Sequence, residues 1–346
     1  MTLKKIAERA GVSLATVSYA LRHHPKIPLA TRERVQAAAR ALGYRPNPRV
    51  AGLMAHIRRG RTRLAGDRLA FVWVHTSRTD AVRQPLLRAV FQGAQARAQQ
   101  AGFGLEEFWT ADAGMTDRRL QKIIRARGIV GVVLSPVTTP ETHVTLDWDW
   151  SLFAAAVVGN VTWTPDLHHA GHHHFLGMRR CLEELAKLGC VRPAALLDEE
   201  THERAKRAWE GAFLAHHPQP RDARALLRIW PRDQRADHGA WLRGTGADAL
   251  IVHPTSALDE LGLRTLAGRR RLPTVTLNWQ EERAGIGGID QGHDRVAAHA
   301  VDLVTSQLQL NELGPPAFPR IMLFGGSWIP PQVNPRISKS STKPGR

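Results

Sequence analysis

A short stretch near the start of the chain, residues 11–21 (GVSLATVSYAL), has the composition of a DNA-reading helix. Gly11 can end one helix, and the hydroxyl of Ser13 can cap the next one. Helical spacing turns one face of this segment toward a core: Val17, Ala20 and Leu21. The opposite face carries short side chains, with Tyr19 as the one large polar residue. Such a face can approach another backbone closely, which suits a helix lying in the major groove of DNA.

A second chemically distinctive stretch is the histidine cluster at residues 168–174 (HHAGHHH). On a helix, the pairs 168/172 and 169/173 would have a spacing compatible with metal binding. However, Gly171 interrupts the segment, and no acidic or cysteine partner is nearby in the sequence. We therefore expect a solvated or cleft-rim loop ahead of a helix that begins at Phe175, and no metal site. Metal binding or pH sensing is the alternative.

The composition indicates a multidomain globular protein without a membrane segment. The 346 residues are enough for two or more folding units, and the hydrophobic share of 43% is ordinary. No apolar run is long enough for a membrane helix, and no signal-peptide core is present. The two cysteines, Cys181 and Cys190, have no metal-type spacing. We expect a cytoplasmic protein with reduced thiols and no cofactor.

Positive charge is concentrated at the start of the chain. Residues 1–63 hold 14 lysines and arginines against two glutamates, which is +12 of the net +17. A basic head on a nearly neutral body is typical of a module that binds a polyanion such as DNA.

The first 45 residues have the pattern of three short helices. Thr2 can cap a helix with an apolar stripe, and a second helix follows Gly11 after a tight turn. Thr31 is expected to cap a third helix, residues 32–42, which Gly43 ends. The inward positions of the first and third helices are Leu3, Ile6, Ala7, Ala10, Val35, Ala38, Ala39 and Leu42. This arrangement predicts a small helix-turn-helix head.

These residues resemble the N-terminal domain of the lac repressor–galactose repressor (LacI/GalR) family. The residues that carry the resemblance are Leu3, Ile6, Ala7, Ala10, Gly11, Val12, Ser13, Thr16, Val17, Ser18, Thr31, Arg32, Val35, Leu42, Gly43, Tyr44, Pro46 and Asn47. The resemblance implies that three positions read base edges: Leu14, Ala15 and Tyr19. It implies phosphate contacts from six others: Ser13, Thr16, Ser18, Thr31, Tyr44 and Asn47. Leu14 and Ala15 offer no hydrogen bonds, so readout there would use thymine methyl groups or groove shape.

The segment after the third helix resembles the family's hinge, which becomes helical on DNA. Leu53, with Met54 beside it, stands where the family inserts a leucine into the minor groove. The alternative for Leu53 is burial against the body. The basic run at 58–63 is either a solvated linker or a further phosphate contact.

From Leu69 onward, short apolar strands alternate with amphipathic helices. Strands are expected at 69–75, 103–109, 130–135, 153–158, 194–197, 226–230, 249–253, 274–277 and 286–289. Helices are expected at 84–101, 116–127, 175–188, 203–216, 236–243, 257–266 and 294–310. This alternation predicts parallel sheets covered by helices, with enough material for two such sheets.

No catalytic signature accompanies this pattern. The run Gly244–Ala249 fits G-x-G-x-x-A formally, but it precedes a strand instead of linking a strand to a helix. Walker, G-x-S-x-G and H-E-x-x-H motifs are missing. An enzyme of carbohydrate metabolism is therefore disfavoured.

The resemblance implies that the body has two lobes, like periplasmic sugar-binding proteins, with an effector cleft between them. The candidates at strand ends are His75, Ser135, Asn160, Arg207, Trp209, His253, Asn278, Trp279 and Asp290. Asn278 stands near the position where the family often has an aspartate, and Pro254-Thr255 replaces a common Asn-Asp. A sugar is one candidate effector.

Together these observations predict a helix-turn-helix head at 1–45, a hinge at 46–66, a two-lobed effector and dimerisation body at 67–330, and a disordered tail at 331–346. The expected function is a sequence-specific transcriptional regulator, in the usual form a repressor. It would bind a pseudo-palindromic operator as a homodimer or larger assembly, under control of a small molecule. The alternative is an effector-independent regulator whose body serves only dimerisation.

The hinge generates a test. Gly52 weakens the short segment 50–55 as a helix, so the segment should order only over kinked DNA. Gly52→Ala should favour the helix by up to about 1 kcal/mol, tighten operator binding and reduce any ligand response. Leu53→Ala should lower specific binding and DNA bending while sparing nonspecific binding. A bending assay in which Leu53→Ala bends operator DNA as fully as the parent chain would show that the segment is only a tether.

Overall fold

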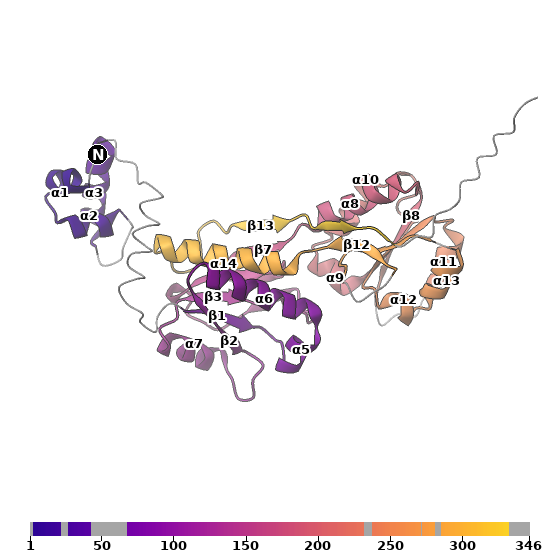
Figure 1. The fold of residues 1–346 in the computed structure, drawn as a ribbon, viewed down its shortest axis with the longest axis horizontal. Helices are drawn as coiled ribbons and strands as arrows, with labels where there is room; N and C mark the ends of the chain where they lie inside the picture. Colours follow the sequence, from indigo (N-terminus) through magenta and orange to yellow (C-terminus); the bar gives the residue numbers. More distant parts are fainter. Residues whose placement is uncertain are drawn as a thin grey trace, which may run out of the picture.

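The computed structural model describes residues 3–21, 27–42, 68–231, 237–270, 272–280 and 285–331. Figure 1 shows a small helical head and a larger body of two lobes. Several predicted features lie outside the described residues: the cap Thr2, the phosphate contacts Tyr44 and Asn47, the hinge with Leu53 and Met54, and the tail from residue 332. No described helix is both long and apolar enough to cross a membrane.

The head consists of three helices: α1 (Leu3–Ala10), α2 (Leu14–Ala20) and α3 (Leu29–Ala41). Gly11 takes a left-handed φ of +62°, which ends α1 and lets the chain turn into α2. Small side chains pack the three helices together: Ile6, Ala7, Ala10, Val17, Ala20, Val35, Ala38 and Ala39. The predicted helix-turn-helix is confirmed.

One detail of the head differs from the prediction. Helix α3 begins at Leu29, with Pro28 at its cap position and no side-chain cap. The Pro28 carbonyl accepts hydrogen bonds from the amides of Thr31 and Arg32, at 3.0 Å each. Thr31 therefore lies inside the first turn and does not cap the helix, because the proline carbonyl starts the helix three residues earlier than expected.

The first lobe is a six-stranded parallel sheet in the order β13-β7-β5-β3-β1-β2. Its strands are β1 (Arg68–Trp73), β2 (Gly104–Trp109), β3 (Gly131–Leu134), β5 (Ala154–Val158), β7 (His168–His172) and β13 (Ile321–Phe324). Its helices are α5 (Arg78–Arg83), α6 (Pro85–Gln100), α7 (Asp117–Ala126), η1 (Trp150–Leu152) and α14 (His293–Leu310). Alternate residues of β1 pack against α6 and α14 on one face and against α7 on the other. A small sheet pairs β4 (His143–Thr145) with β6 (Thr162–Thr164).

The second lobe repeats this plan in the order β14-β12-β11-β10-β8-β9. Its strands are β8 (Pro193–Asp198), β9 (Leu227–Trp230), β10 (Ala249–His253), β11 (Thr274–Thr276), β12 (Gly287–Asp290) and β14 (Ser327–Ile329). Its helices are α8 (His174–Lys187), α9 (Glu199–Arg204), α10 (Ala208–His216), α11 (His238–Gly244), α12 (Ala257–Glu260) and α13 (Leu263–Arg270). All pairings are parallel except that of β14 with β12. The predicted α/β body of two parallel-sheet lobes is confirmed.

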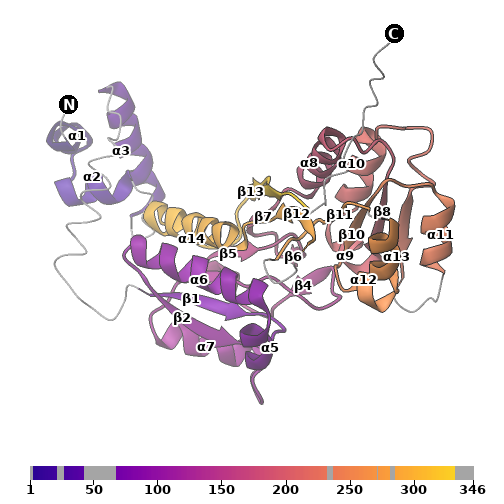
Figure 2. The same ribbon diagram turned by 45° about the vertical axis from the view of Figure 1, so that its right-hand side comes forward.

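The chain passes between the lobes three times. It leaves the first lobe after β7, returns after β12 to form α14, and crosses again from β13 to β14. Figure 2 shows the two later crossings as the yellow and orange segments between the two sheets. The carboxyl ends of several strands from both lobes therefore meet at the crossings.

The histidine cluster is the largest departure from the sequence prediction. Residues 168–172 form the buried strand β7, not a solvated or cleft-rim loop. The strand pairs with β5 on one side and with β13 on the other. Its backbone hydrogen bonds are thus satisfied within the sheet, which allows polar side chains to be buried there. Among the described residues, no group of His, Cys, Asp or Glu has the geometry to hold a metal ion.

Two predicted helices are broken. The segment predicted at 203–216 is split between α9 and α10, because Lys206 and Arg207 take left-handed φ angles of 54° and 56°. The segment predicted at 257–266 is split into α12 and α13 at Gly262, where φ is +64°. The prediction lacked helix α5, the short helix η1 and strands β4, β6, β7, β13 and β14.

The packing of α14 on α6 generates a test. A Cβ atom added at Gly93 of α6 would overlap the backbone of Asp294 in α14. Gly93→Ala should therefore lower the free energy of unfolding by about 1–3 kcal/mol, as overpacking does elsewhere. Gly268→Ala is the matched control, because Gly268 lies in helix α13 with nothing within 4 Å of an added Cβ. Chemical denaturation of the full chain measures both. Equal stability of the two variants would contradict close contact between α6 and α14.

Candidate DNA interface and effector cavity

The outer face of α2 presents the three residues that were predicted to read bases. Leu14 is 53% exposed and Tyr19 is 44% exposed, and Ala15 is exposed between them along the helix. Because Val17 and Ala20 are buried in the head, the helix can turn only this face outward. The face is mostly apolar and lacks charged side chains, so it suits contact with base edges more than contact with phosphates.

Hydroxyl groups surround the start of α2. Ser13 caps the helix, its Oγ accepting a hydrogen bond of 3.1 Å from the amide of Thr16. The hydroxyls of Ser13 and Thr16 also lie 2.9 Å apart, in hydrogen-bond contact. Ser18 and Thr31 are half-buried, on α2 and in the first turn of α3. Hydroxyls at helix starts can donate to a phosphate together with the first-turn amides.

A cavity of about 210 Å³ lies between the lobes, at the carboxyl ends of their strands. The first lobe contributes part of the wall: Leu86, Val90, Pro136, Val137, Thr138, Val158, Gly159, Asn160, Val161, Gly171, His172 and Val296. The rest comes from the second lobe and the crossings: His174, Thr201, Arg204, Ala205, Trp209, His253, Asn278, Gln291 and His293. Ligands of two-lobed α/β proteins bind at this kind of position.

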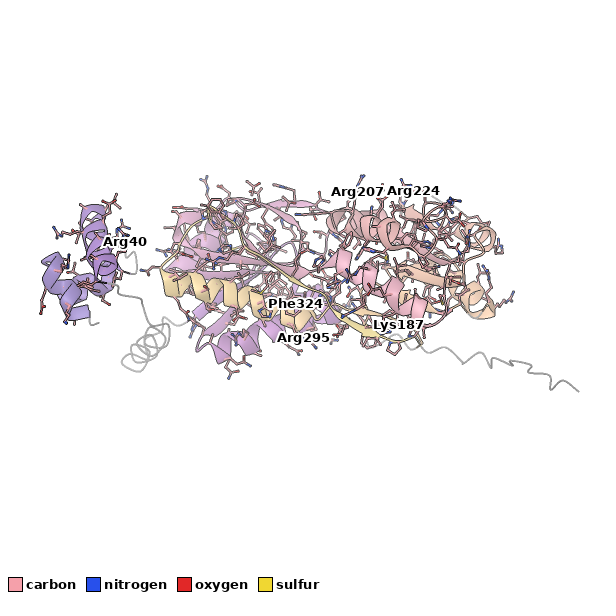
Figure 3. All side chains as sticks on the ribbon, turned by 90° about the horizontal axis from the view of Figure 1, so that it is seen from above. Arg40, Lys187, Arg207, Arg224, Arg295 and Phe324 are labelled. Carbon is pink, nitrogen blue, oxygen red and sulfur yellow. The ribbon has the colours of Figure 1, made fainter. Side chains whose placement is uncertain are left out.

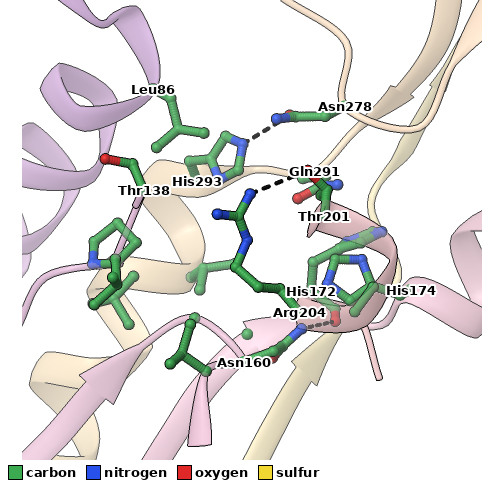
Figure 4. A pocket seen from close by; sticks show the side chains of 18 of the residues that line it. Leu86, Thr138, Asn160, His172, His174, Thr201, Arg204, Asn278, Gln291 and His293 are labelled. Atoms are coloured by element: carbon green, nitrogen blue, oxygen red, sulfur yellow. Dashed lines mark hydrogen bonds between the residues drawn. The ribbon is translucent and has the colours of Figure 1, made fainter. Parts of the chain in front are cut away.

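Aromatic rings form a continuous row along the wall. The ring centroids of His172 and His174 lie 5.2 Å apart, those of His174 and Trp209 4.8 Å, and those of Trp209 and His253 4.9 Å. His293 stands opposite, and its Nε2 lies 2.9 Å from Oδ1 of Asn278 (Figure 4). Four imidazoles and one indole thus face a single space.

Burial keeps the imidazoles of His172, His174 and His293 neutral near pH 7. It lowers the pKa of His172 to about 3, assisted by the neighbouring His293 and His173. It lowers the pKa of His293 to about 4, although Asp290 and Asp294 act in the opposite direction. The pKa of His174 is lowered well below its ordinary value, again mainly by burial. Neutral imidazoles offer one donor and one acceptor each, which suits a hydroxylated or anionic ligand.

Arg204 brings the positive charge of this wall. Its Nη1 donates to the carbonyl of Thr139 at 2.6 Å, and its Nη2 donates to the hydroxyl of Thr201 at 3.1 Å. In Figure 4 the guanidinium reaches into the space that His293 and His172 also face. The polar wall is completed by Gln291, which donates to the Leu277 carbonyl at 2.7 Å.

The structure brings four of the nine predicted effector residues together at this cavity: Asn160, Trp209, His253 and Asn278. The other five do not line it: His75, Ser135, Arg207, Trp279 and Asp290. Arg207 is exposed on the outer surface, where it pairs with Glu203 at 2.8 Å (Figure 3).

The remaining four residues outside the cavity have local structural roles. The Ser135 hydroxyl accepts a hydrogen bond from the amide of Val74 at 3.0 Å. The indole of Trp279 donates to the Ile286 carbonyl at 2.9 Å. Asp290 accepts from the amide of Gly292 at 2.9 Å, and the amide of the exposed His75 donates to Thr110.

Sequence reasoning missed Arg204, His172, His174, Gln291 and His293. Each lies at or just beyond the carboxyl end of a strand or in the short helix that follows one. The available signal was the placement of the histidine cluster between two alternating units, which is where a crossing strand would be expected.

Comparison with known proteins agrees with the division of the chain into a DNA-binding head and a two-lobed body. Residues 2–47 match the family model "Bacterial regulatory proteins, lacI family". The HTH-type transcriptional regulator PtxS of Pseudomonas plecoglossicida is 31% identical over 136 residues, which span 39% of this chain and 36% of that protein.

Two solved structures share the whole architecture. One is the Lac repressor dimer bound to operator and the anti-inducer ONPF, with a TM-score of 0.52 and 19% identity over 96% of this chain and 98% of that one. The other is the transcriptional regulator CelR in complex with cellobiose, with a TM-score of 0.51 and 16% identity over 94% of this chain and 97% of that one. At these identities the likeness establishes the fold. Residues 2–47 thus match the DNA-binding domain of the lacI family of bacterial regulatory proteins, and the chain as a whole shares the fold of the two regulators.

Proposed function

We propose that this protein is a transcriptional repressor that binds a pseudo-palindromic operator as a homodimer in the cytoplasm. A small molecule bound between the two lobes controls its affinity for DNA. The observation that carries the proposal is a cavity lined by both lobes, with buried polar groups facing it, in a chain with a lacI-type head. The printed descriptions of the Lac repressor and CelR structures, one with operator and an anti-inducer and the other with cellobiose, support it by analogy.

Recognition of DNA would divide between two sets of side chains. The exposed face of α2 would contact base edges through Leu14, Ala15 and Tyr19. The hydroxyls of Ser13, Thr16, Ser18 and Thr31, with Tyr44 and Asn47, would hold the phosphates. The excess of basic residues in 1–63 supplies the attraction that does not depend on base sequence.

Control by a ligand would act through the relative position of the lobes. A molecule held at once by Asn160 of the first lobe and by Trp209 and Asn278 of the second favours the arrangement in which both sides reach it. The head is joined to the first lobe, so that arrangement can favour or oppose the spacing of two heads on an operator. Couplings of this kind are about 1–3 kcal/mol.

Two substitutions test the assignment of roles in the head. Tyr19→Ala should change which operator half-site is preferred, because Tyr19 lies on the exposed face of α2. Thr31→Ala should weaken all sites about equally, because a phosphate contact carries no sequence information. Binding of each variant to a set of half-sites differing by one base pair measures both. An equal, unselective loss in the two variants would mean that the reading face is misplaced.

The function itself is tested with the full chain and an operator selected from random DNA. The logarithm of the affinity should fall with the logarithm of the salt concentration, with a slope of about −0.9 for each neutralised phosphate. At least one compound in a panel of sugars, sugar derivatives and nucleosides should change operator affinity, and Asn278→Ala should reduce that change.

Each negative result has a distinct meaning. A salt slope near zero would contradict DNA binding through the basic head. Normal operator binding that no compound alters would favour a body that serves only dimerisation.

A further inference from the structure

The wall of the cavity is positive in character and lacks acidic groups. Among the wall residues that the structure describes, ten are polar or basic and none is aspartate or glutamate: Thr138, Asn160, His172, His174, Thr201, Arg204, His253, Asn278, Gln291 and His293. An ionised carboxylate can only accept hydrogen bonds, so it would suit a ligand rich in hydroxyl groups and would repel an anion. In this cavity, acceptors are limited to amides, hydroxyls and the unprotonated nitrogens of imidazoles.

Four helices of eight or more residues also begin at the cavity. Leu86 of α6, His174 of α8, Trp209 of α10 and His293 of α14 lie in their first turns and line the wall. Three of these helices, α6, α10 and α14, have no side-chain cap. Helix N-termini carry partial positive charge and free amide donors, so together they favour an anion in the space between them.

His172 gives an independent sign that a ligand belongs here. It is only 5% exposed, and neither of its ring nitrogens makes a hydrogen bond of normal length and angle, although the Phe324 backbone is close enough to raise its pKa. The ring is held closely, because a Cβ at Gly177 would lie 2.7 Å from its Nε2 and a Cβ at Gly326 would lie 3.0 Å from its Cε1. The indole Nε1 of Trp209, which is 1% exposed, is also unpartnered. Orphaned ring nitrogens also occur away from the cavity, as at His238 and Trp163, but those of His172 and Trp209 belong to residues that line it, where a ligand or water can complete them.

We propose that the effector is a small polyhydroxylated anion, a molecule of one-sugar size that bears a carboxylate or phosphate group received by Arg204 and the imidazoles of this cavity. This inference rests on the proposed control by a ligand between the lobes. At about 210 Å³, the cavity has room for a single-ring compound, since a bound water needs only about 10–15 Å³ of such space. A cation is disfavoured, because the described residues offer no metal-binding group.

An anion in this space would also couple binding to proton uptake. Without ligand, burial and the neighbouring His293 and His173 keep His172 neutral, with a pKa of about 3. A negative charge beside an imidazole favours its protonated form and raises its pKa. Asp290 and Asp294 already act in that direction on His293, whose pKa is about 4. Affinity for an anion should therefore rise as the pH falls, whereas affinity for a neutral sugar should not.

The experiment is isothermal titration of the full chain with matched pairs of compounds. D-glucose and D-galactose are each compared with the corresponding aldonic acid and hexose 6-phosphate, at pH 8 and at pH 6. At least one anion should bind 10-fold or more tightly than its neutral parent. For an aldonic acid, whose carboxylate stays ionised from pH 8 to pH 6, the affinity should be higher at pH 6, whereas a hexose phosphate itself takes up a proton near pH 6. Comparing the affinities for the aldonic acids with those for the hexose 6-phosphates distinguishes a sugar acid from a sugar phosphate as the effector.

Substitutions of Arg204 and Arg207 test whether the anion binds in the cavity. Arg204→Gln should weaken binding of the preferred anion 10-fold or more, and Arg204→Lys should lose less, because it keeps the charge but not the planar set of donors. Arg207→Gln is the control, because Arg207 lies three residues further on, is exposed and does not line the cavity. Thermal unfolding of each variant shows whether the protein is folded. If Arg204→Gln is not folded, the anion series is repeated with Arg204→Lys and with Trp209→Phe, which removes the orphaned indole donor.

Several outcomes would overturn the inference. These are a neutral sugar that binds as tightly as its acid and phosphate, no binding by any anion of the panel, or equal losses in Arg204→Gln and Arg207→Gln. Operator affinity measured on the same samples separates this failure from that of the proposed function. A neutral sugar that alters operator binding would refute only the anion, whereas absence of operator binding would refute the repressor.

Discussion

The body depends on the burial of one polar strand, β7, between β5 and β13. The strand ends at His172 and leads directly into α8 of the other lobe, so it sets where the first crossing lies. Gly171 has no side chain because a Cβ there would overlap the amide oxygen of Asn160. Asn160 in turn donates to the His172 carbonyl at 3.0 Å. The cavity wall, the crossing and the unpartnered imidazole therefore all follow from the position of this strand.

Burying imidazoles without partners has a cost that the fold must offset. Each unsatisfied buried polar group costs about 1–3 kcal/mol, whereas the apolar cores of the two lobes are large and well separated. The lobes fold around these cores without help from the cavity. His172 belongs to the first lobe and Trp209 to the second. A ligand that forms hydrogen bonds with both residues therefore offsets this free-energy cost only when both lobes contact it, so ligand binding and closure of the lobes are linked.

Local patterns predicted the head and most of the body, while non-local contacts determined the rest. The caps and small apolar residues of α1 and α2 act within one or two turns, and strands such as β5 are apolar throughout. The strand 168–172 is polar, and its burial comes from β13, about 150 residues later in the chain. Arg204 was missed and Arg207 chosen because the helix break at Lys206 and Arg207 depends on packing, which no local pattern indicates.

The connection between head and body limits how a ligand can act. In the sequence, residues 43–67 join the head to the first lobe, and within the described part of the chain the second lobe is connected to the first by the three crossings. A ligand in the cavity can therefore influence DNA binding by favouring one relation of the lobes over another. By thermodynamic reciprocity, a ligand that tightens operator binding must itself bind more tightly to the DNA-bound protein, and one that loosens it must bind more weakly. Ligand affinity measured with and without operator thus determines the direction of control independently of any assay of transcription.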